Sequence, residues 1–296
     1  MSRVQTLARR QPAARLILLL AALCLTIPAH AQAERPCPFS DSAKSFSGTA
    51  TEQARCLLRP VRRLGNIGPR RPTLPAPLDQ LDQPLGVTRE APARFLSDHR
   101  IDAAKELGGA LGTRVTAKYF VIHDTSSPLF PFVSNDPAAA ENFPLGTIDG
   151  PAWSGNNLER WRTSSGDKAH LFVNRMGKSV TTLDFNSARR ATKFERNRPA
   201  TRRGVFLHVE NIQPRRTNSR GIDEFSPQGG FTDAQLDRLA LAYVAASVRR
   251  GQWLIPAFHS VLDVTIPNAH DDPQNFDLDR WAARLGALLD NIRAAQ

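Results

Sequence analysis

The sequence is poor in cysteine, with three in 296 residues, and it has no internal repeat. It also lacks a convincing membrane span: the apolar run from Leu16 to Ile27 is shorter than the roughly 20 residues that a membrane helix needs. Arginines precede this run, and Ala29-His30-Ala31 after it has the small–x–small form of a signal peptidase site. We therefore expect residues 1–31 to be a signal peptide, with no stable membrane insertion after cleavage.

The few cysteines fit an exported protein. Cys24 follows Leu23, whereas a lipid-attachment signal would place a small residue there, so no lipid anchor is expected. Cys37 and Cys56 lie beyond the signal peptide, in a chain destined for a periplasmic or extracellular, oxidising compartment. An even pair near one end of such a chain predicts one disulfide that ties down an N-terminal loop.

Acidic residues are scarce relative to basic ones, 28 against 39, which gives a formal net charge of +11. Outside the cytoplasm, a basic surface suits an anionic partner such as the cell wall or a membrane surface. Export argues against nucleic acid as that partner. Scattered arginines can also serve only to keep a protein soluble, so charge alone leaves both interpretations open.

The order of expected elements indicates an α/β fold with a mixed central β-sheet flanked by helices. Apolar runs and alternation predict strands at Val115–His123, Ala169–Asn174, Ser179–Phe185 and Gly204–Ile212. Helical spacing and capping signals predict helices from Asp98 to Leu111, from Thr232 to Gly251 and from Leu278 to Ile292. We expect residues 32–113, which are proline-rich between Pro69 and Pro92, to form a wrapping or linking N-terminal extension, and residues 114–296 to form the main domain.

Metal-ligand residue types gather near the C-terminus. The stretch from Ala257 to Phe276 contains His259, His270, Asp271 and Asp272. Imidazole and carboxylate are the ligands of a catalytic zinc, which takes three from the protein and leaves the fourth position to water. A further ligand must come from elsewhere in the chain, and His123, at the end of an apolar strand, is the best candidate. The sequence therefore predicts a catalytic Zn²⁺ site.

Four segments occur in an order that is typical of one superfamily. They are Val121-Ile122-His123-Asp124-Thr125, His170-Leu171-Phe172-Val173-Asn174-Arg175-Met176-Gly177, Gly204-Val205-Phe206-Leu207-His208-Val209-Glu210-Asn211, and His259 followed by Asp272-Pro273-Gln274-Asn275-Phe276. From about Tyr119 to Trp281 the chain thus resembles the zinc-dependent N-acetylmuramoyl-L-alanine amidases, a superfamily shared with peptidoglycan recognition proteins. It departs from them at Gln274, where glycine is common, and at His270, where lysine is common.

The resemblance implies a zinc site made by His123, His259 and Asp272, with Asp271 or His270 as substitutes for the third ligand. It implies that Glu210 acts as general base and then general acid, and that His270, in the place of the lysine, stabilises the oxyanion. The implied substrate is peptidoglycan or a muropeptide, cleaved at the amide between N-acetylmuramic acid and L-alanine. We expect the enzyme to be a monomer.

Other interpretations of the same residues stay open. The protein could be a non-catalytic module that binds peptidoglycan on the same fold, or a zinc amidase that acts on a different amide. His208 shares the expected strand face of Glu210 and either joins the metal ligands or shapes the site. The stretch from Asp124 to Asp167 predicts a binding loop, in which Trp153 and Trp161 either stack on substrate or pack in the core.

Overall fold

The computed structural model describes residues 36–130, 136–163, 169–217 and 224–294. The expected signal peptide lies outside these residues. Among the residues described, no helix combines the length and the apolar character that crossing a membrane requires.

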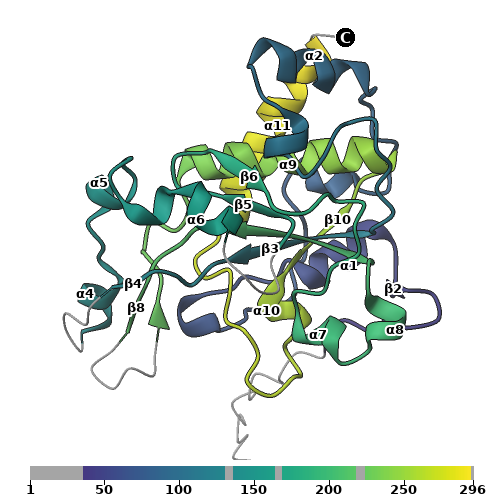
Figure 1. The fold of residues 1–296 in the computed structure, drawn as a ribbon. Helices are drawn as coiled ribbons and strands as arrows, with labels where there is room; N and C mark the ends of the chain where they lie inside the picture. The colour runs from purple at the N-terminus through teal and green to yellow at the C-terminus, as the bar shows by residue number, and fades with distance from the viewer. Residues whose placement is uncertain (1–35, 131–135, 164–168, 218–223, 295–296) are drawn as a thin grey trace, which may run out of the picture. The chain divides into compact units, whose positions relative to one another are not determined.

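The centre of the fold is a five-stranded sheet in the order β10-β3-β7-β5-β6 (Figure 1). Strands β10 (Ile255–Phe258), β3 (Tyr119–Asp124), β7 (Phe206–Asn211) and β5 (Leu171–Val173) run parallel, and β6 (Ser179–Thr181) pairs antiparallel with β5. Nearly every residue of the parallel strands is buried, as expected for a parallel sheet that is covered on both faces. The predicted α/β class with a mixed sheet is confirmed.

Two long helices, α9 (Asp233–Arg250) and α11 (Leu278–Ala294), pack against each other on one side of the sheet (Figure 1). The predicted capping box begins α9: Thr232 Oγ1 accepts a hydrogen bond from Gln235 N–H, and the Gln235 side chain accepts one from Thr232 N–H. The helix ends at Gly251, whose φ of 78° is a left-handed conformation that glycine adopts without strain.

Residues 36–113 are part of the same hydrophobic core, which differs from the expected wrapping extension. This segment is rich in proline, but the leucines between its prolines, including Leu74, Leu78 and Leu81, are buried in the core. The regular elements of the segment are β1 (Phe39–Ser40), β2 (Ser45–Phe46), α1 (Ala50–Leu57), η1 (Arg63–Gly65), η2 (Leu78–Gln80), α2 (Glu90–Asp98) and α3 (Ala103–Glu106). Where one helix was expected from Asp98 to Leu111, the chain instead ends α2 and starts the separate, Asp102-capped α3.

The two faces of the sheet are covered by different elements. Phe120 in β3 packs edge-on against Tyr243 of α9, with 5.3 Å between the ring centroids. Its neighbour Tyr119 points to the opposite face, where its hydroxyl donates a hydrogen bond to Gln53 Oε1 of α1 over 2.6 Å. Because side chains alternate along a strand, His123 lies on the face of Tyr119, away from α9.

Shorter elements complete the fold. A second sheet, in the order β4-β8-β9, consists of β4 (Leu129–Phe130), β8 (Arg215–Thr217) and β9 (Glu224–Phe225). The described part of the expected binding loop also contains α4 (Pro137–Glu141), α5 (Leu145–Ile148), η3 (Ser154–Asn156) and α6 (Leu158–Thr163). Three short helices lie on the side of the sheet opposite α9 (Figure 1): α7 (Lys193–Arg196), α8 (Pro199–Arg202) and α10 (His259–Leu262).

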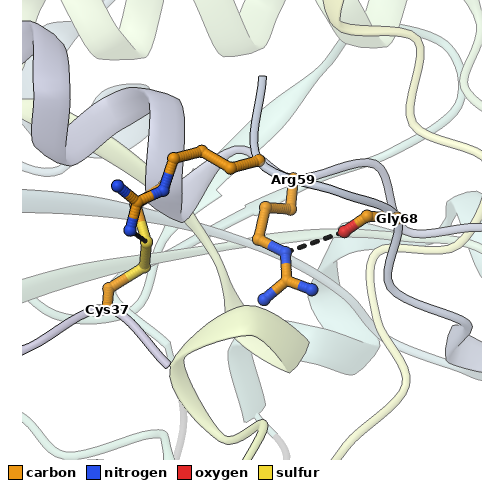
Figure 2. The surroundings of a disulfide bond; sticks show 5 residues. Cys37, Arg59 and Gly68 are labelled. Atoms are coloured by element: carbon orange, nitrogen blue, oxygen red, sulfur yellow. Dashed lines mark hydrogen bonds between the residues drawn. A yellow bond between two sulfur atoms is a disulfide. The ribbon is translucent and has the colours of Figure 1, made fainter. Parts of the chain in front are cut away.

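The predicted disulfide joins Cys37 to Cys56 of α1 (Figure 2). Arg70 donates a hydrogen bond from Nη2 to Cys56 Sγ over 3.1 Å. Nearby, Arg59 Nε donates to the carbonyl oxygen of Gly68 over 2.7 Å, as Figure 2 shows. The disulfide and the Arg70 contact thus connect the start of the described chain and the segment after α1 to Cys56 of that helix, and the Arg59 contact connects two parts of that segment.

Reduction of this disulfide is expected to lower the free energy of unfolding by about 2–4 kcal/mol, because the cross-link restricts the unfolded chain. Thermal melts with and without reductant measure the effect. Metal affinity should stay unchanged, since the cystine contacts α1 and not the strand ends that carry the candidate ligands. A double Cys37→Ser, Cys56→Ser variant is the control, and its melt should not respond to reductant. Equal melting temperatures for the reduced and oxidised native protein would contradict this prediction.

Candidate metal centre

Three side chains from distant parts of the sequence converge at the carboxyl ends of the central strands. His123 lies near the end of β3, His259 directly follows the adjacent parallel strand β10, and Asp272 lies in the loop before α11. All three are buried, and one potential ligand atom from each lies within 4.8 Å of the others. This edge of a parallel sheet is where α/β proteins commonly bind ligands. The three residues form a group that can hold a metal ion.

Two distances within this group, each to a different oxygen of Asp272, are compatible with ligands that share one metal ion. His259 Nδ1 lies 2.9 Å from Asp272 Oδ1, and His123 Nδ1 lies 3.6 Å from Asp272 Oδ2. Ligands at about 2.0–2.1 Å from a tetrahedral metal are roughly 3.3 Å apart, which lies between these two values. The buried His259 Nδ1 lies close to Asp272 Oδ1 but lacks the alignment of a hydrogen bond with it or with any other described residue. A cation between these atoms would satisfy it.

Backbone contacts hold Asp272 in place and decide between it and Asp271. Asp272 Oδ2 accepts a hydrogen bond from Asp124 N–H over 3.1 Å, and its carbonyl oxygen accepts one from Ser260 N–H over 2.9 Å. Asp271 instead lies 3.5 Å from Arg215 Nη2 and is about one-third exposed. Of the two aspartates, Asp272 is therefore the one that faces both histidines.

The charge state of His259 depends on its two carboxylate neighbours. Its Nε2 hydrogen-bonds to Asp263 Oδ2 over 3.1 Å, while Nδ1 faces Asp272. Burial lowers the pKa of His259, but Asp272 and Asp263 outweigh burial and raise the pKa to about 10. Burial and the nearby His259 hold the pKa of His123 well below its usual value. Without a metal, His259 is thus a cation and His123 is neutral.

The affinity for added Zn²⁺ is expected to fall about tenfold per unit as pH is lowered from about 7 to about 5.5. Below its pKa of about 10, His259 is protonated in the metal-free protein, so binding must displace that proton. Competition titrations against a chromophoric chelator at several pH values measure the slope. Calorimetry in buffers of different ionisation enthalpy should show the release of about one proton at about pH 6, below the pKa of a zinc-bound water. A pH-independent affinity across this range would contradict the prediction.

Glu210 lies beside the three candidate ligands. In the register of the sheet it is directly opposite His123, and its Oε1 lies 3.8 Å from His123 Nδ1. Burial and the carboxylate of Asp272 raise the pKa of Glu210 well above its usual value. A carboxyl group with a raised pKa next to a metal site can both accept and return a proton near neutral pH.

A cavity of about 370 Å³ opens onto this group. The candidate site residues that line it are Glu210, His259, His270 and Asp272, and the cationic side chains on its wall are Lys193 and Arg196. His270 stacks on the His259 ring, with 4.5 Å between centroids, and its side chain is 54% exposed. His270 therefore lies at the mouth of the cavity and can reach a bound molecule.

The remaining sequence candidates occupy other positions. His208 Nδ1 hydrogen-bonds to His123 Nε2 over 3.1 Å, on the side of the ring away from Nδ1, so His208 is not among the ligands. His170 accepts a hydrogen bond from His208 N–H and is fully buried. Trp153 belongs to a small apolar cluster, and Trp161 stacks on Phe172, so both pack against the protein itself.

Two acidic residues near the site were missed by sequence reasoning. Asp263 is buried against His259, and Glu195 of α7 is buried against His208. The spacing of four residues between His259 and Asp263 on one helical turn was a local signal for the first. No local signal marks Glu195, because it lies in helix α7 and its partner His208 lies in strand β7, with no short pattern linking the two.

Comparisons with known proteins identify no relative of this chain. No protein-family model, no curated protein and no solved structure matches the chain.

Proposed function

We propose that the protein is an exported zinc hydrolase that cleaves the amide between N-acetylmuramic acid and L-alanine in peptidoglycan. The observation that carries the proposal is the convergence of His123, His259 and Asp272, with Glu210 facing the same space. Two imidazoles and one carboxylate form a donor set typical of catalytic zinc, which leaves a position for water and substrate. The choice of amide rests on the resemblance of the segments that carry these residues to the amidase superfamily.

The mechanism assigns a separate task to each group. When bound, zinc lowers the pKa of a water molecule to about 7 and polarises the scissile carbonyl. Glu210 takes a proton from the attacking water and returns it to the leaving amine nitrogen, which its raised pKa favours. His270 donates a hydrogen bond to the oxygen of the tetrahedral intermediate from the mouth of the cavity. Asp124 N–H holds the Asp272 carboxylate throughout.

Two cationic side chains on the cavity wall can contact an anionic substrate, on a lining that also includes the acidic Asp124, Glu210 and Asp272. The two are Lys193 and Arg196, beside the candidate metal ligands. Stem peptides of peptidoglycan carry free carboxylates, which these two side chains attract. The overall excess of basic residues acts in the same direction over longer range.

Metal analysis followed by a digestion assay tests the proposal. The purified protein is expected to contain one zinc per chain and to release stem peptides from sacculi, and a chelator should stop the release until zinc is restored. Mass spectrometry of the products identifies the bond, because cleavage at the lactyl amide leaves a free L-alanine amino group. Metal-free protein that still binds sacculi would instead support a binding module. Zinc-dependent cleavage at another position would keep the hydrolase and change its substrate.

A further inference from the structure

A row of three buried ionisable side chains ends at the candidate metal ligand His123. Glu195 Oε2 of α7 lies 3.1 Å from His208 Nε2, and His208 Nδ1 lies 3.1 Å from His123 Nε2. Glu195 and His208 are fully buried, and His123 is 1% exposed. Burying a carboxylate and two imidazoles is costly unless each has a defined partner, so the row calls for a physical explanation.

The hydrogen-bond partners of Glu195 favour one direction for the protons in the row. Its Oε2 accepts hydrogen bonds from Thr192 N–H, Thr192 Oγ1–H and Ala191 N–H, so this oxygen is an acceptor. His208 Nε2 lies 3.1 Å from this oxygen without the alignment of a hydrogen bond, and the nearby carboxylate favours a proton on Nε2 rather than Nδ1, which leaves His208 Nδ1 as an acceptor. His123 in turn donates from Nε2, and its Nδ1 keeps a free lone pair. That lone pair faces Asp272.

The orientation of the His259 ring is fixed in a similar way, by the carboxylate of Asp263. Its Nε2 is hydrogen-bonded to Asp263 Oδ2, which leaves Nδ1 directed at Asp272. The Asp263 carboxylate also accepts hydrogen bonds from the backbone N–H groups of Lys193 and Phe194, at the start of α7. Both histidines are thus connected to one short helix, one through Asp263 and the other through Glu195 and His208.

We infer that Glu195, His208 and Asp263 are positioning residues, and that α7 serves as a common support that presents the Nδ1 atoms of both histidines to one metal ion. Partners of this kind fix the tautomer and orientation of a ligating imidazole, and their loss commonly weakens metal binding by about 10–100-fold. The inference rests on the metal-binding part of the proposed function and is independent of the substrate.

Titration of the metal-free protein with Co²⁺, followed by visible absorption, tests the inference without any substrate. His208→Leu removes both contacts of the row and is expected to weaken Co²⁺ binding by about 10–100-fold and to alter the absorption bands. His208→Asn keeps an acceptor near the Nδ1 position and should recover part of the affinity. Glu195→Gln keeps the shape of the side chain but removes its charge, and it should give an intermediate loss.

His170→Asn is the matched control. His170 is as buried as His208 and stacks on it, but it does not contact His123, and asparagine can still accept from His208 N–H. This variant should lose stability while it keeps its Co²⁺ affinity within about threefold. Circular dichroism and thermal melts of the metal-free forms identify folded variants. If His208→Leu does not fold, His208→Asn and Glu195→Gln decide the question.

The outcomes separate this inference from the proposed function. Wild-type affinity and spectrum in folded His208→Leu, or in both His208→Asn and Glu195→Gln, would overturn the positioning role alone. An equal loss of affinity in His170→Asn would also overturn it, because burial in general would then explain the effect. Wild-type protein that binds Co²⁺ but cleaves no amide would overturn the proposed function and leave the inference standing.

Discussion

Replacement of Glu210 by glutamine is expected to lower kcat by about 10²–10⁴-fold while zinc remains bound. The change keeps the size of the side chain but removes the group that, in the proposed mechanism, exchanges a proton with water and the leaving amine. Because Glu210 is not one of the three converging ligands, zinc content should stay at the wild-type level. Rates of stem-peptide release, together with zinc analysis of the same preparation, measure both effects.

Glu224→Gln provides a matched control for this variant. Burial also raises the pKa of Glu224, but this residue lies in β9 and does not line the metal cavity. Its replacement should leave kcat within about threefold of wild type. Turnover that survives in Glu210→Gln with normal zinc content would exclude Glu210 as the base and direct attention to His270.

Replacement of Asp272 by alanine is expected to have the largest effect on metal binding. This carboxylate contacts the Nδ1 atoms of both histidines, so its loss removes one ligand and also leaves the cationic His259 with Asp263 as its close anionic partner. Zinc affinity should fall by more than the roughly 100-fold that loss of an outer partner costs, and hydrolysis should fall with it. Competition titrations with a chromophoric chelator measure the affinity.

Asp271→Ala tests the assignment of the neighbouring aspartate. Asp271 contacts Arg215 rather than the histidines, so this variant should bind zinc within about threefold of wild type. The assignment would be reversed if Asp271→Ala lost its metal while Asp272→Ala kept it. Melting curves of the two metal-free variants show whether either change acts only by unfolding the chain.

Much of the fold and the three converging residues could be predicted because their signals are local. An apolar strand that ends in His123 and a capping box at Thr232 each appear within a few consecutive residues. The proximity of His123 and His259 also follows from topology, since adjacent parallel strands end at the same edge of a sheet. The resemblance already favoured Asp272 and left Asp271 as an alternative, and the structure supports that choice because Asp272 faces both histidines while Asp271 contacts Arg215.

The rest of the site depends on packing that no short pattern records. Glu195 forms a capping box with Thr192. This sequence feature predicts the start of a helix but does not predict a contact with a distant histidine. Its contact with His208 exists only because α7 folds back over β7. In the same way, the proline content between Pro69 and Pro92 concealed leucines that fill the core.

The contact between Tyr119 and the N-terminal segment limits where a shortened recombinant protein can begin. A recombinant fragment that starts at residue 114 would leave the phenol of Tyr119 without Gln53 Oε1 and Phe46 N–H, and would uncover the aromatic cluster that Phe46 closes. Water would replace the lost hydrogen bonds, so the main cost is the exposure of apolar area, at roughly 25 cal/mol per Å². Expression boundaries for crystallisation or assay should therefore fall before Cys37, so that the strand that carries His123 keeps its full support.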